Sequence, residues 1–320
     1  MATGTTATGT PWTSLQSSAL ADGSVGRRIV PTALVNTTGI PCMMYFHGAG
    51  SSGNFFETAG VFRVLRDYLL DAGIAIVEAV GGAASNTASE GGTQNWGNQS
   101  SRVAYGLAFD WADAIHNFSA VTLLGRSMGG MNAYYFGTRH PAISPRVTAI
   151  IINSGVSNLI VANNVPAGGN PDWITGSPSG SGKFWPTMWT AHGVEDSTAF
   201  AAAVSPEYDP HQFSPSVFAG KRIMQLVGTA DNTVPPASHG LAMRTLYAGQ
   251  PLVDELIVGD GKSHSSTNGM YDYPDEMFAF IAASLPNPPE PPAPGESKVY
   301  QRVRSYYFDG EVSYLLFPHA

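Results

Sequence analysis

The sequence predicts an α/β fold in which helices cover both faces of a mostly parallel sheet. The first observation is a series of short apolar runs, each rich in valine, isoleucine and leucine. Runs that are apolar on both faces are typical of parallel strands buried between two layers of helices. The second observation is that stretches with helical periodicity alternate with these runs, as they do in βαβ units. The third is that apolar residues make up 43% of the 320 residues, which is enough for a sizeable core.

The apolar runs predict six strands. Each run is four to seven residues long, a length that suits a strand better than a helix. In chain order the expected strands are 42–46, 74–80, 121–124, 147–152, 223–227 and 253–258.

The stretches between the runs predict five helices. Between the first two strands, Leu65 and Leu69 fall on one helical face, and Val103 and Leu107 repeat in the same way in the next stretch. In chain order the expected helices are 61–72, 101–118, 129–139, 237–248 and 275–285.

Composition divides the chain into four zones. Residues 1–22 are rich in Thr, Ser, Ala and Gly and are expected to form an extended N-terminal arm. Residues 23–285 form the α/β domain, in which an insertion at about 156–218 is expected to form a cap over the site. Residues 286–295 contain six prolines between 286 and 294 and predict a stiff linker. Residues 296–320 form a tail.

The tail has the sequence pattern of a β-hairpin. An Asp-Gly pair at 309–310 separates two β-rich runs, 298–308 and 311–317. Aromatic residues fall on both faces of these runs, and a lone hairpin is marginal in water. We therefore expect the tail to attach to a neighbouring subunit or a larger assembly. The alternative is that it folds back onto its own domain.

A candidate nucleophile follows the strand at 121–124. The segment Gly125-Arg-Ser127-Met-Gly129 matches Gly-x-Ser-x-Gly, and a helical pattern comes directly after it. At a strand-to-helix turn this motif projects a serine hydroxyl, and its small residues let strand and helix approach each other. The alternative interpretation is a glycine-rich turn with an incidental serine.

An acid, a base and an oxyanion site can be assigned to three other strand ends. Asp231 follows the strand at 223–227 and can orient an imidazole, while His264 lies in a glycine loop after 253–258 and can act as a general base. The strand at 42–46 ends in His-Gly-Ala-Gly, where a backbone N–H, together with that of Met128, can hold an oxyanion. The imidazole of His47 is read as structural.

These four segments together resemble the signature segments of the α/β-hydrolases, especially the esterase and polyester-depolymerase branches, over about residues 25–285. The resemblance implies that Ser127 is the nucleophile, His264 the base and Asp231 the orienting acid. It also implies that the N–H groups of Ala49 and Met128 form the oxyanion hole. Neither the arm nor the tail matches that family.

Other polar residues compete for these roles. His239 falls in a helical stretch and is read as a packing or surface residue. Asp260 is an alternative partner for His264, although Asp231 is better placed, and Asp209 and His211 are read as turn residues. The sequence contains no His-Glu-x-x-His or comparable spacing, so we expect catalysis without a metal or other cofactor.

Aromatic residues near the cap suggest a substrate pocket. Trp185 and Trp189 lie in a dense aromatic cluster, and Trp96 lies in the polar loop 91–100. They are expected either to line an apolar acyl pocket or simply to pack the cap.

The expected function is hydrolysis of carboxylic esters through an acyl-enzyme. An acyltransferase, a serine peptidase and a non-catalytic structural subunit with a relict hydrolase domain are the alternatives. The carboxylate of Asp231 is expected to raise the pKa of His264 somewhat above about 6.5.

Charge and composition limit the partners. The 16 basic and 24 acidic residues give a net charge of −8, which argues against binding to nucleic acid. The sequence contains no run of eighteen apolar residues, so we expect no membrane span, and residues 1–10 lack the features of a signal peptide. The arm, linker and tail suggest a homo-oligomer, or docking onto an assembly through 1–22 and 296–320. We expect a bacteriophage tail esterase, with a bacterial cytoplasmic enzyme as the alternative.

Overall fold

A computed structural model describes most of the chain up to Pro286, and two strands beyond it. The described residues are 1–49, 55–58, 60–80, 95–159, 188, 191–194, 197–203, 207–265 and 268–286, together with the backbone of 302–308 and 311–316. Much of the predicted cap and nearly all of the predicted linker lie outside these residues.

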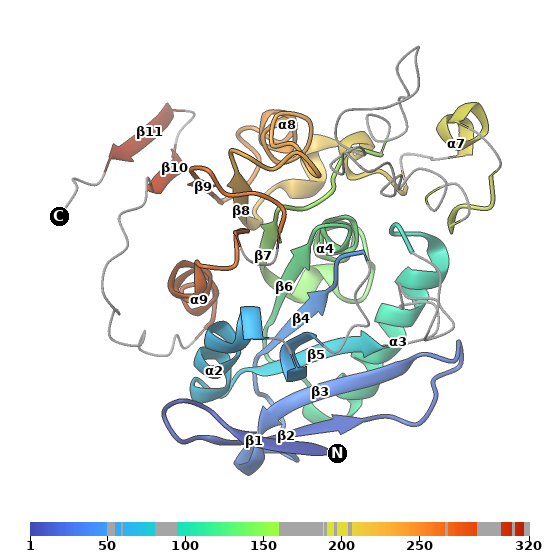
Figure 1. The fold of residues 1–320 in the computed structure, drawn as a ribbon, viewed down its shortest axis with the longest axis vertical. Coiled ribbons are helices and arrows are strands. Elements are labelled where there is room, and N and C mark those ends of the chain that lie inside the picture. The colour runs from blue at the N-terminus through green and yellow to red at the C-terminus, as the bar shows by residue number, and fades with distance from the viewer. Residues whose placement is uncertain are drawn as a thin grey trace.

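A mixed sheet forms the centre of the fold (Figure 1), and 11 of its strands lie in the described residues. The six predicted strands are all present and form its parallel centre, so the prediction of a mostly parallel sheet is confirmed. In spatial order they are β5 (Ala75–Val80), β4 (Cys42–Phe46), β6 (Val121–Arg126), β7 (Val147–Asn153), β8 (Arg222–Gly228) and β9 (Val253–Gly259).

The five predicted helices are also present and cover both faces of the sheet. One face packs against α2 (Arg63–Asp71) and α9 (Pro274–Ala282). The other packs against α3 (Gln99–His116), α4 (Gly129–Thr138) and α8 (Gly240–Leu246). Two further helices lie in connections between strands: α1 (Phe55–Thr58) between β4 and β5, and α7 (Ser197–Ala203) between β7 and β8.

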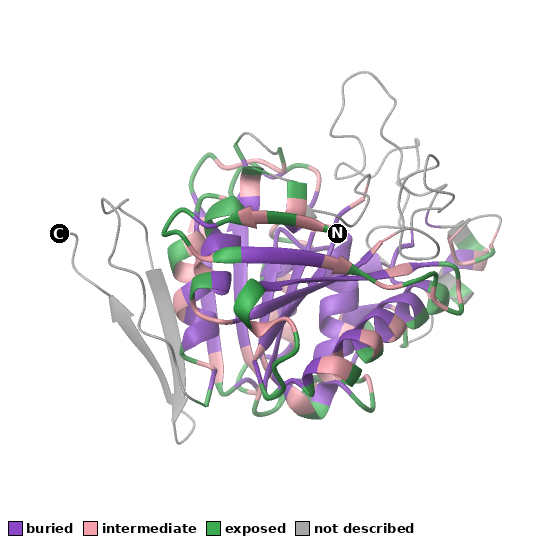
Figure 2. Cartoon of the chain, turned by 90° about the horizontal axis from the view of Figure 1, so that it is seen from below, coloured by how far each residue is buried: buried purple, intermediate pink, exposed green. Residues whose placement is uncertain are grey.

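Strand β4 illustrates why the parallel strands are apolar on both faces. Its residues Cys42, Met44 and Phe46 join the core on the α3 and α4 side, whereas Met43 and Tyr45 join the core on the α2 and α9 side. All five are buried, because helices exclude water from both faces. Figure 2 shows the central strands buried along their length and the helices buried on one side only.

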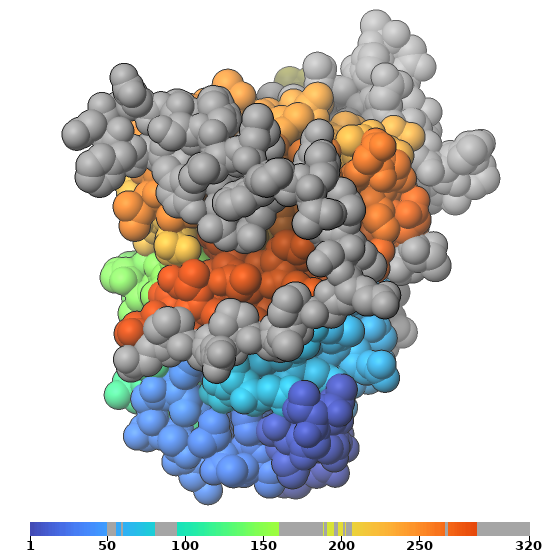
Figure 3. All heavy atoms as spheres, turned by 90° about the vertical axis from the view of Figure 1, so that its left-hand side faces the viewer, coloured from blue at the N-terminus to red at the C-terminus, as the bar shows by residue number. Residues whose placement is uncertain are grey.

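The prediction that residues 1–22 form an arm outside the domain is wrong. They contain β1 (Ala2–Thr5) and β2 (Pro11–Gln16), which pair antiparallel with each other and with β3 (Val25–Pro31). Strand β3 in turn pairs antiparallel with β5. In the space-filling view (Figure 3), these N-terminal residues lie against the rest of the domain at its lower end.

Side chains as well as backbone hold the N-terminal strands in place. Trp12 is only 6% exposed and joins the core beside α2, where the Arg66 guanidinium lies 5.0 Å from its ring centroid. The hydroxyl of Thr6 donates to a carboxylate oxygen of Asp71 at 2.7 Å. The polar composition that suggested an arm therefore belongs to two strands at the edge of the sheet and to the turn between them, where Thr6 bonds to α2.

The two predicted strands of the C-terminal hairpin are present, whereas the predicted turn at 309–310 lies outside the described residues. Strand β10 (Arg302–Phe308) pairs antiparallel with β11 (Glu311–Leu316), with Phe308 opposite Glu311. However, β10 also pairs antiparallel with β9. The hairpin therefore extends the sheet of its own domain, contrary to the expectation that it lies apart from that fold, and the fold-back alternative describes it better.

The helices of the structure also test the expectation that no segment of the chain spans a membrane. Within the described residues, every helix is too short or too polar to cross a bilayer.

Replacing Trp12 with alanine tests whether the N-terminal strands belong to the domain. Because the indole is buried, we expect Trp12→Ala to lower the free energy of unfolding by about 3–5 kcal/mol in urea denaturation. Leu252→Ala is the control, since Leu252 is 59% exposed. If Trp12→Ala lowers the free energy of unfolding no more than Leu252→Ala does, the N-terminal strands are only loosely attached to the domain.

Candidate active site

Ser127 lies at a sharp turn between β6 and α4, with its backbone at a φ of +52°. Its N–H donates to the carbonyl of Asn153 at 3.1 Å, and its own carbonyl accepts from the N–H of Val156 at 2.8 Å. A side chain at Gly129 would overlap the carbonyl oxygen of Phe46. The turn therefore needs glycine there, as the Gly-x-Ser-x-Gly motif predicts.

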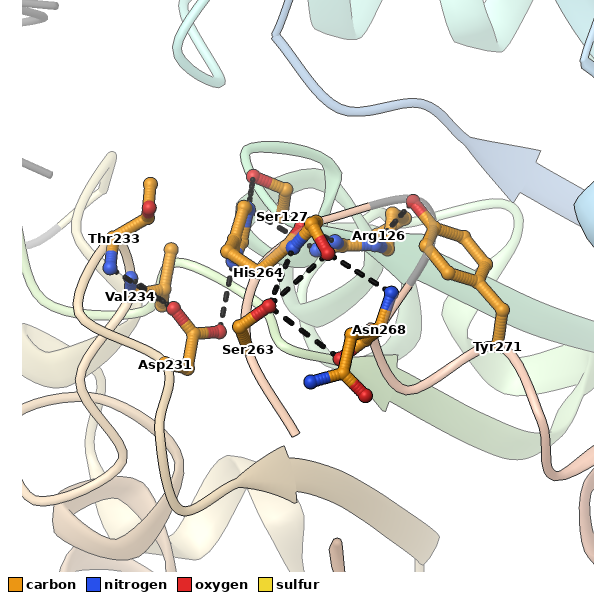
Figure 4. A network of polar contacts seen from close by, with 10 residues as sticks. Arg126, Ser127, Asp231, Thr233, Val234, Ser263, His264, Asn268 and Tyr271 are labelled. Carbon is orange, nitrogen blue, oxygen red and sulfur yellow. Dashed lines mark hydrogen bonds and ion pairs between the residues drawn. The ribbon is translucent and has the colours of Figure 1, made fainter. Parts of the chain in front are cut away.

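The structure brings the three predicted catalytic residues into one hydrogen-bonded chain (Figure 4). The Ser127 Oγ lies 2.8 Å from Nε2 of His264, and Nδ1 of His264 lies 2.8 Å from Oδ2 of Asp231. The other carboxylate oxygen of Asp231 accepts from the N–H groups of Thr233 at 3.0 Å and Val234 at 2.8 Å. The buried carboxylate is thereby fixed in position opposite the imidazole.

A fourth residue, Arg126, contacts the same imidazole. Its Nη1 lies 3.2 Å from His264 Nε2, and its Nη2 donates to the His264 carbonyl at 2.8 Å. Because a guanidinium can only donate, Nε2 must be the acceptor nitrogen, and Nδ1 carries the proton that bonds to Asp231. In this tautomer the Nε2 lone pair is shared between Arg126 and the Ser127 hydroxyl, and the shorter contact is the one to Ser127, whose proton Nε2 can accept.

Arg126 is the site residue that sequence reasoning missed. It is 3% exposed, and its Nε donates to the hydroxyl of Tyr271 at 2.8 Å, with the guanidinium 4.9 Å from the centroid of that ring. Its position in the sequence could have indicated a role in the site, because packing does not explain a charged residue at the end of a buried strand and directly before the nucleophile.

Asp231 raises the pKa of His264 as expected, but the prediction that this pKa lies above about 6.5 is wrong. Burial lowers the pKa of the imidazole below its ordinary 6.5, and the positive charge of Arg126 lowers it further. The hydrogen bond and the charge of Asp231 act in the opposite direction but do not compensate. His264 is therefore neutral, and able to accept a proton, at a lower pH than an ordinary histidine.

The two predicted oxyanion donors lie on either side of Ser127. Met128 follows it in the chain, and Ala49 lies in the loop after β4, which passes close to the nucleophile. A Cβ placed on Gly48 would lie 3.1 Å from Ser127 Cβ. Within the described residues, neither the Met128 nor the Ala49 N–H donates a hydrogen bond. The imidazole of His47 is buried and donates from Nδ1 to the Gly48 carbonyl at 3.1 Å, which suits a structural role.

A small pocket opens beside the nucleophile. Its volume is about 160 Å³, well below the ~300–1,000 Å³ of typical ligand pockets. The described residues that line it are Tyr45, Gly48, Ala49, Arg126, Ser127, His264 and Tyr271.

Of the predicted tryptophans, Trp96 is described and is not among these lining residues. Trp96 is buried and packs in an apolar cluster with Met128 and Met131, so of the two interpretations the structure favours packing. Trp185 and Trp189 lie outside the described residues.

The competing polar residues are engaged elsewhere. Asp260 accepts from the hydroxyl of Thr229 at 3.2 Å. His239 is fully buried, its Nδ1 accepts from the N–H of Ser157 at 3.2 Å, and burial lowers its pKa to about 3. Asp209 caps a short helix by accepting from the N–H of His211 at 3.1 Å, as expected for a turn residue.

Comparison with known proteins identifies the fold. The chain matches no protein-family model and no curated protein, but it is similar to solved structures. An esterase of Pyrococcus furiosus, Pf2001, aligns at a TM-score of 0.56 and 13% identity, covering 85% of this chain and 92% of that one. A 2,6-dihydroxy-pseudo-oxynicotine hydrolase aligns at a TM-score of 0.58 and 18% identity, covering 87% of this chain and 70% of that one. The chain has the α/β-hydrolase fold.

A larger enzyme contains the same fold as one of its parts. A prolyl endopeptidase aligns at a TM-score of 0.60 and 15% identity, covering 85% of this chain. The aligned region makes up 38% of the prolyl endopeptidase chain. At these identities the likeness shows the fold alone.

The rate at which a fluorophosphonate labels Ser127 should report the protonation of His264. Because only the neutral imidazole activates the serine, labelling should rise with pH about a midpoint below 6.5. Arg126→Met removes a positive charge that opposes protonation, so its midpoint should lie at higher pH. A wild-type midpoint above 6.5, or an unchanged midpoint in the variant, would contradict this account of the site.

Proposed function

We propose that the protein is a serine hydrolase that cleaves carboxylic esters through an acyl-enzyme. The observation that carries the proposal is the hydrogen-bonded chain from Ser127 through His264 to Asp231, which ends at a small pocket. The α/β-hydrolase fold supports it, because this fold carries a nucleophilic serine at the same strand-to-helix turn.

In the first half-reaction, Ser127 attacks the ester carbonyl and its proton passes to Nε2 of His264. The N–H groups of Met128 and Ala49 stabilise the negative charge that develops on the carbonyl oxygen. Asp231 stabilises the imidazolium, to which it is bonded through Nδ1. The alcohol then leaves with the proton from Nε2, and the acyl group remains on Ser127.

In the second half-reaction, water repeats these steps. His264 takes a proton from the water molecule, the resulting hydroxide attacks the acyl carbonyl, and the proton returns to the Ser127 oxygen as the acid leaves. Because both half-reactions need a neutral imidazole at the start, the lowered pKa of His264 favours turnover at neutral and mildly acidic pH.

Two observations favour an ester over a peptide substrate. The pocket beside Ser127 suits a small acyl group. In addition, the alignment covers nearly the whole length of the Pyrococcus furiosus esterase but 38% of the prolyl endopeptidase. Serine peptidase, acyltransferase and relict structural subunit are the alternatives. Attachment to an assembly and action on cell-envelope esters in a phage tail stay predictions from composition.

A series of 4-nitrophenyl esters of increasing acyl length tests the proposal. Because the pocket is small, kcat/KM should be highest for acetate and butyrate and fall for longer chains. Ser127→Ala should lower turnover by a factor on the order of 10⁴–10⁶ without unfolding the protein. Ser216→Ala, which changes an exposed serine outside the site, should have no effect.

The alternatives give different results in the same assay. Faster cleavage of peptides than of esters would make the protein a peptidase, and transfer to an added alcohol in preference to water would make it an acyltransferase. No turnover together with no fluorophosphonate labelling would identify a relict site.

A further inference from the structure

Most buried arginines among the described residues form an ion pair with a carboxylate, and Arg126 does not. Arg27, Arg66 and Arg102 each form an ion pair with a carboxylate. Among the residues that the structure describes, no carboxylate lies within ion-pair distance of Arg126. Arg28 also lacks such a partner, but its guanidinium lies over the ring of Trp111 and does not line the pocket.

The hydrogen bonds of Arg126 all go to neutral acceptors. These are the Tyr271 hydroxyl, the His264 carbonyl and the His264 Nε2. A guanidinium has five N–H groups, so three are used within the protein and two remain. A buried charge is costly without an opposite charge, and neutral acceptors compensate it only in part.

The pocket places this charge beside the nucleophile. Arg126 and Ser127 line the same cavity of about 160 Å³, and none of the described residues that line it is acidic. Figure 4 shows the guanidinium between His264 and Tyr271, and both Arg126 and Ser127 contact Nε2 of the imidazole. A ligand in this pocket therefore meets a reactive hydroxyl together with a positive charge that has no acidic partner among the described residues.

We propose that Arg126 determines substrate specificity by binding a carboxylate at the far end of a short acyl group. The preferred substrates are then half-esters of small dicarboxylic acids. This inference rests on the proposed function. A guanidinium binds a carboxylate through paired, charge-assisted hydrogen bonds, which supply both affinity and orientation.

The pocket suits the acyl part of such an ester better than the alcohol part. The acyl group stays attached to Ser127 through both half-reactions, so a small pocket beside that residue can hold it throughout, whereas the alcohol must depart after the first. A pocket of about 160 Å³ also restricts the chain between the two carboxyl groups to a few atoms.

Two ethyl esters of matched shape test the inference. Monoethyl succinate carries a carboxylate where ethyl levulinate carries a neutral methyl ketone, and release of ethanol measures the hydrolysis of both. Since a hydrogen bond to a charged group contributes ~1.5–3 kcal/mol, wild-type kcat/KM should be about 10- to 100-fold higher for the succinate. The gain should appear chiefly in KM.

Variants at Arg126 separate binding from a merely structural role. Arg126→Met should remove the preference for succinate, and Arg126→Lys should keep part of it because the charge remains. The ratio of the two substrates is the readout, because any effect on His264 changes both reactions alike. Arg63→Met, which changes an exposed arginine of α2, should keep the wild-type ratio. Protection of wild-type Ser127 from fluorophosphonate by free succinate, but not by levulinate, gives a second test that needs no variant.

The outcomes distinguish this inference from the proposed function. Hydrolysis of ethyl levulinate with no preference for succinate, or an unchanged ratio in Arg126→Met, overturns the inference and leaves the esterase proposal intact. A preference for acetoxyacetate, which carries its carboxylate on the alcohol side, over monoethyl succinate overturns the acyl placement. If no ester is hydrolysed and Ser127 is not labelled, the proposed function fails and the inference fails with it.

Discussion

The left-handed backbone at Ser127 is the constraint around which the site is built. A non-glycine residue at a φ of +52° costs about 1–3 kcal/mol and persists only when its surroundings hold it there. Here the N–H of Ser127 bonds to the end of β7, and its carbonyl accepts from both Gly130 and Val156. Two parallel strands and the first turn of α4 thus fix the hydroxyl before any substrate arrives. The two strands are buried on both faces, and this close packing supplies the rigidity that the backbone conformation of Ser127 needs.

The electrostatics of the site follow from the burial of one charge next to that turn. In the described residues, Arg126 has no acidic partner, and its guanidinium contacts both the backbone and the ring of His264. The same contact fixes the tautomer of the imidazole and reduces its basicity. The imidazole of His264 therefore contacts two groups of opposite charge, Asp231 at Nδ1 and Arg126 at Nε2, and burial strengthens the influence of both on its pKa.

The sequence predicted those parts of the fold in which local pattern and tertiary environment agree. Parallel strands such as β4 are apolar because both faces are covered, so their pattern reveals them. Strand β3 went unrecognised because Arg27 and Arg28 interrupt it, and their partners Glu57, Glu78 and His116 come from distant segments. The order of Ser127, Asp231 and His264 could be read from motifs, since each follows a strand. The role of Arg126 could not, because it depends on contacts with His264 and Tyr271, which lie far from it in the sequence.

The pairing of β10 with β9 has a consequence for how the protein behaves in solution. Strand β9 carries His264 just beyond its end, and without a neighbour on its outer side it would present a row of unpaired N–H and C=O groups. Such a row is a template on which another extended chain can add. The C-terminal hairpin occupies that position, as β1, β2 and β3 do beyond β5 at the opposite end of the sheet. The antiparallel flanks therefore keep other extended chains from adding to the edges of the parallel centre, and the C-terminal hairpin does so at the strand that leads to His264.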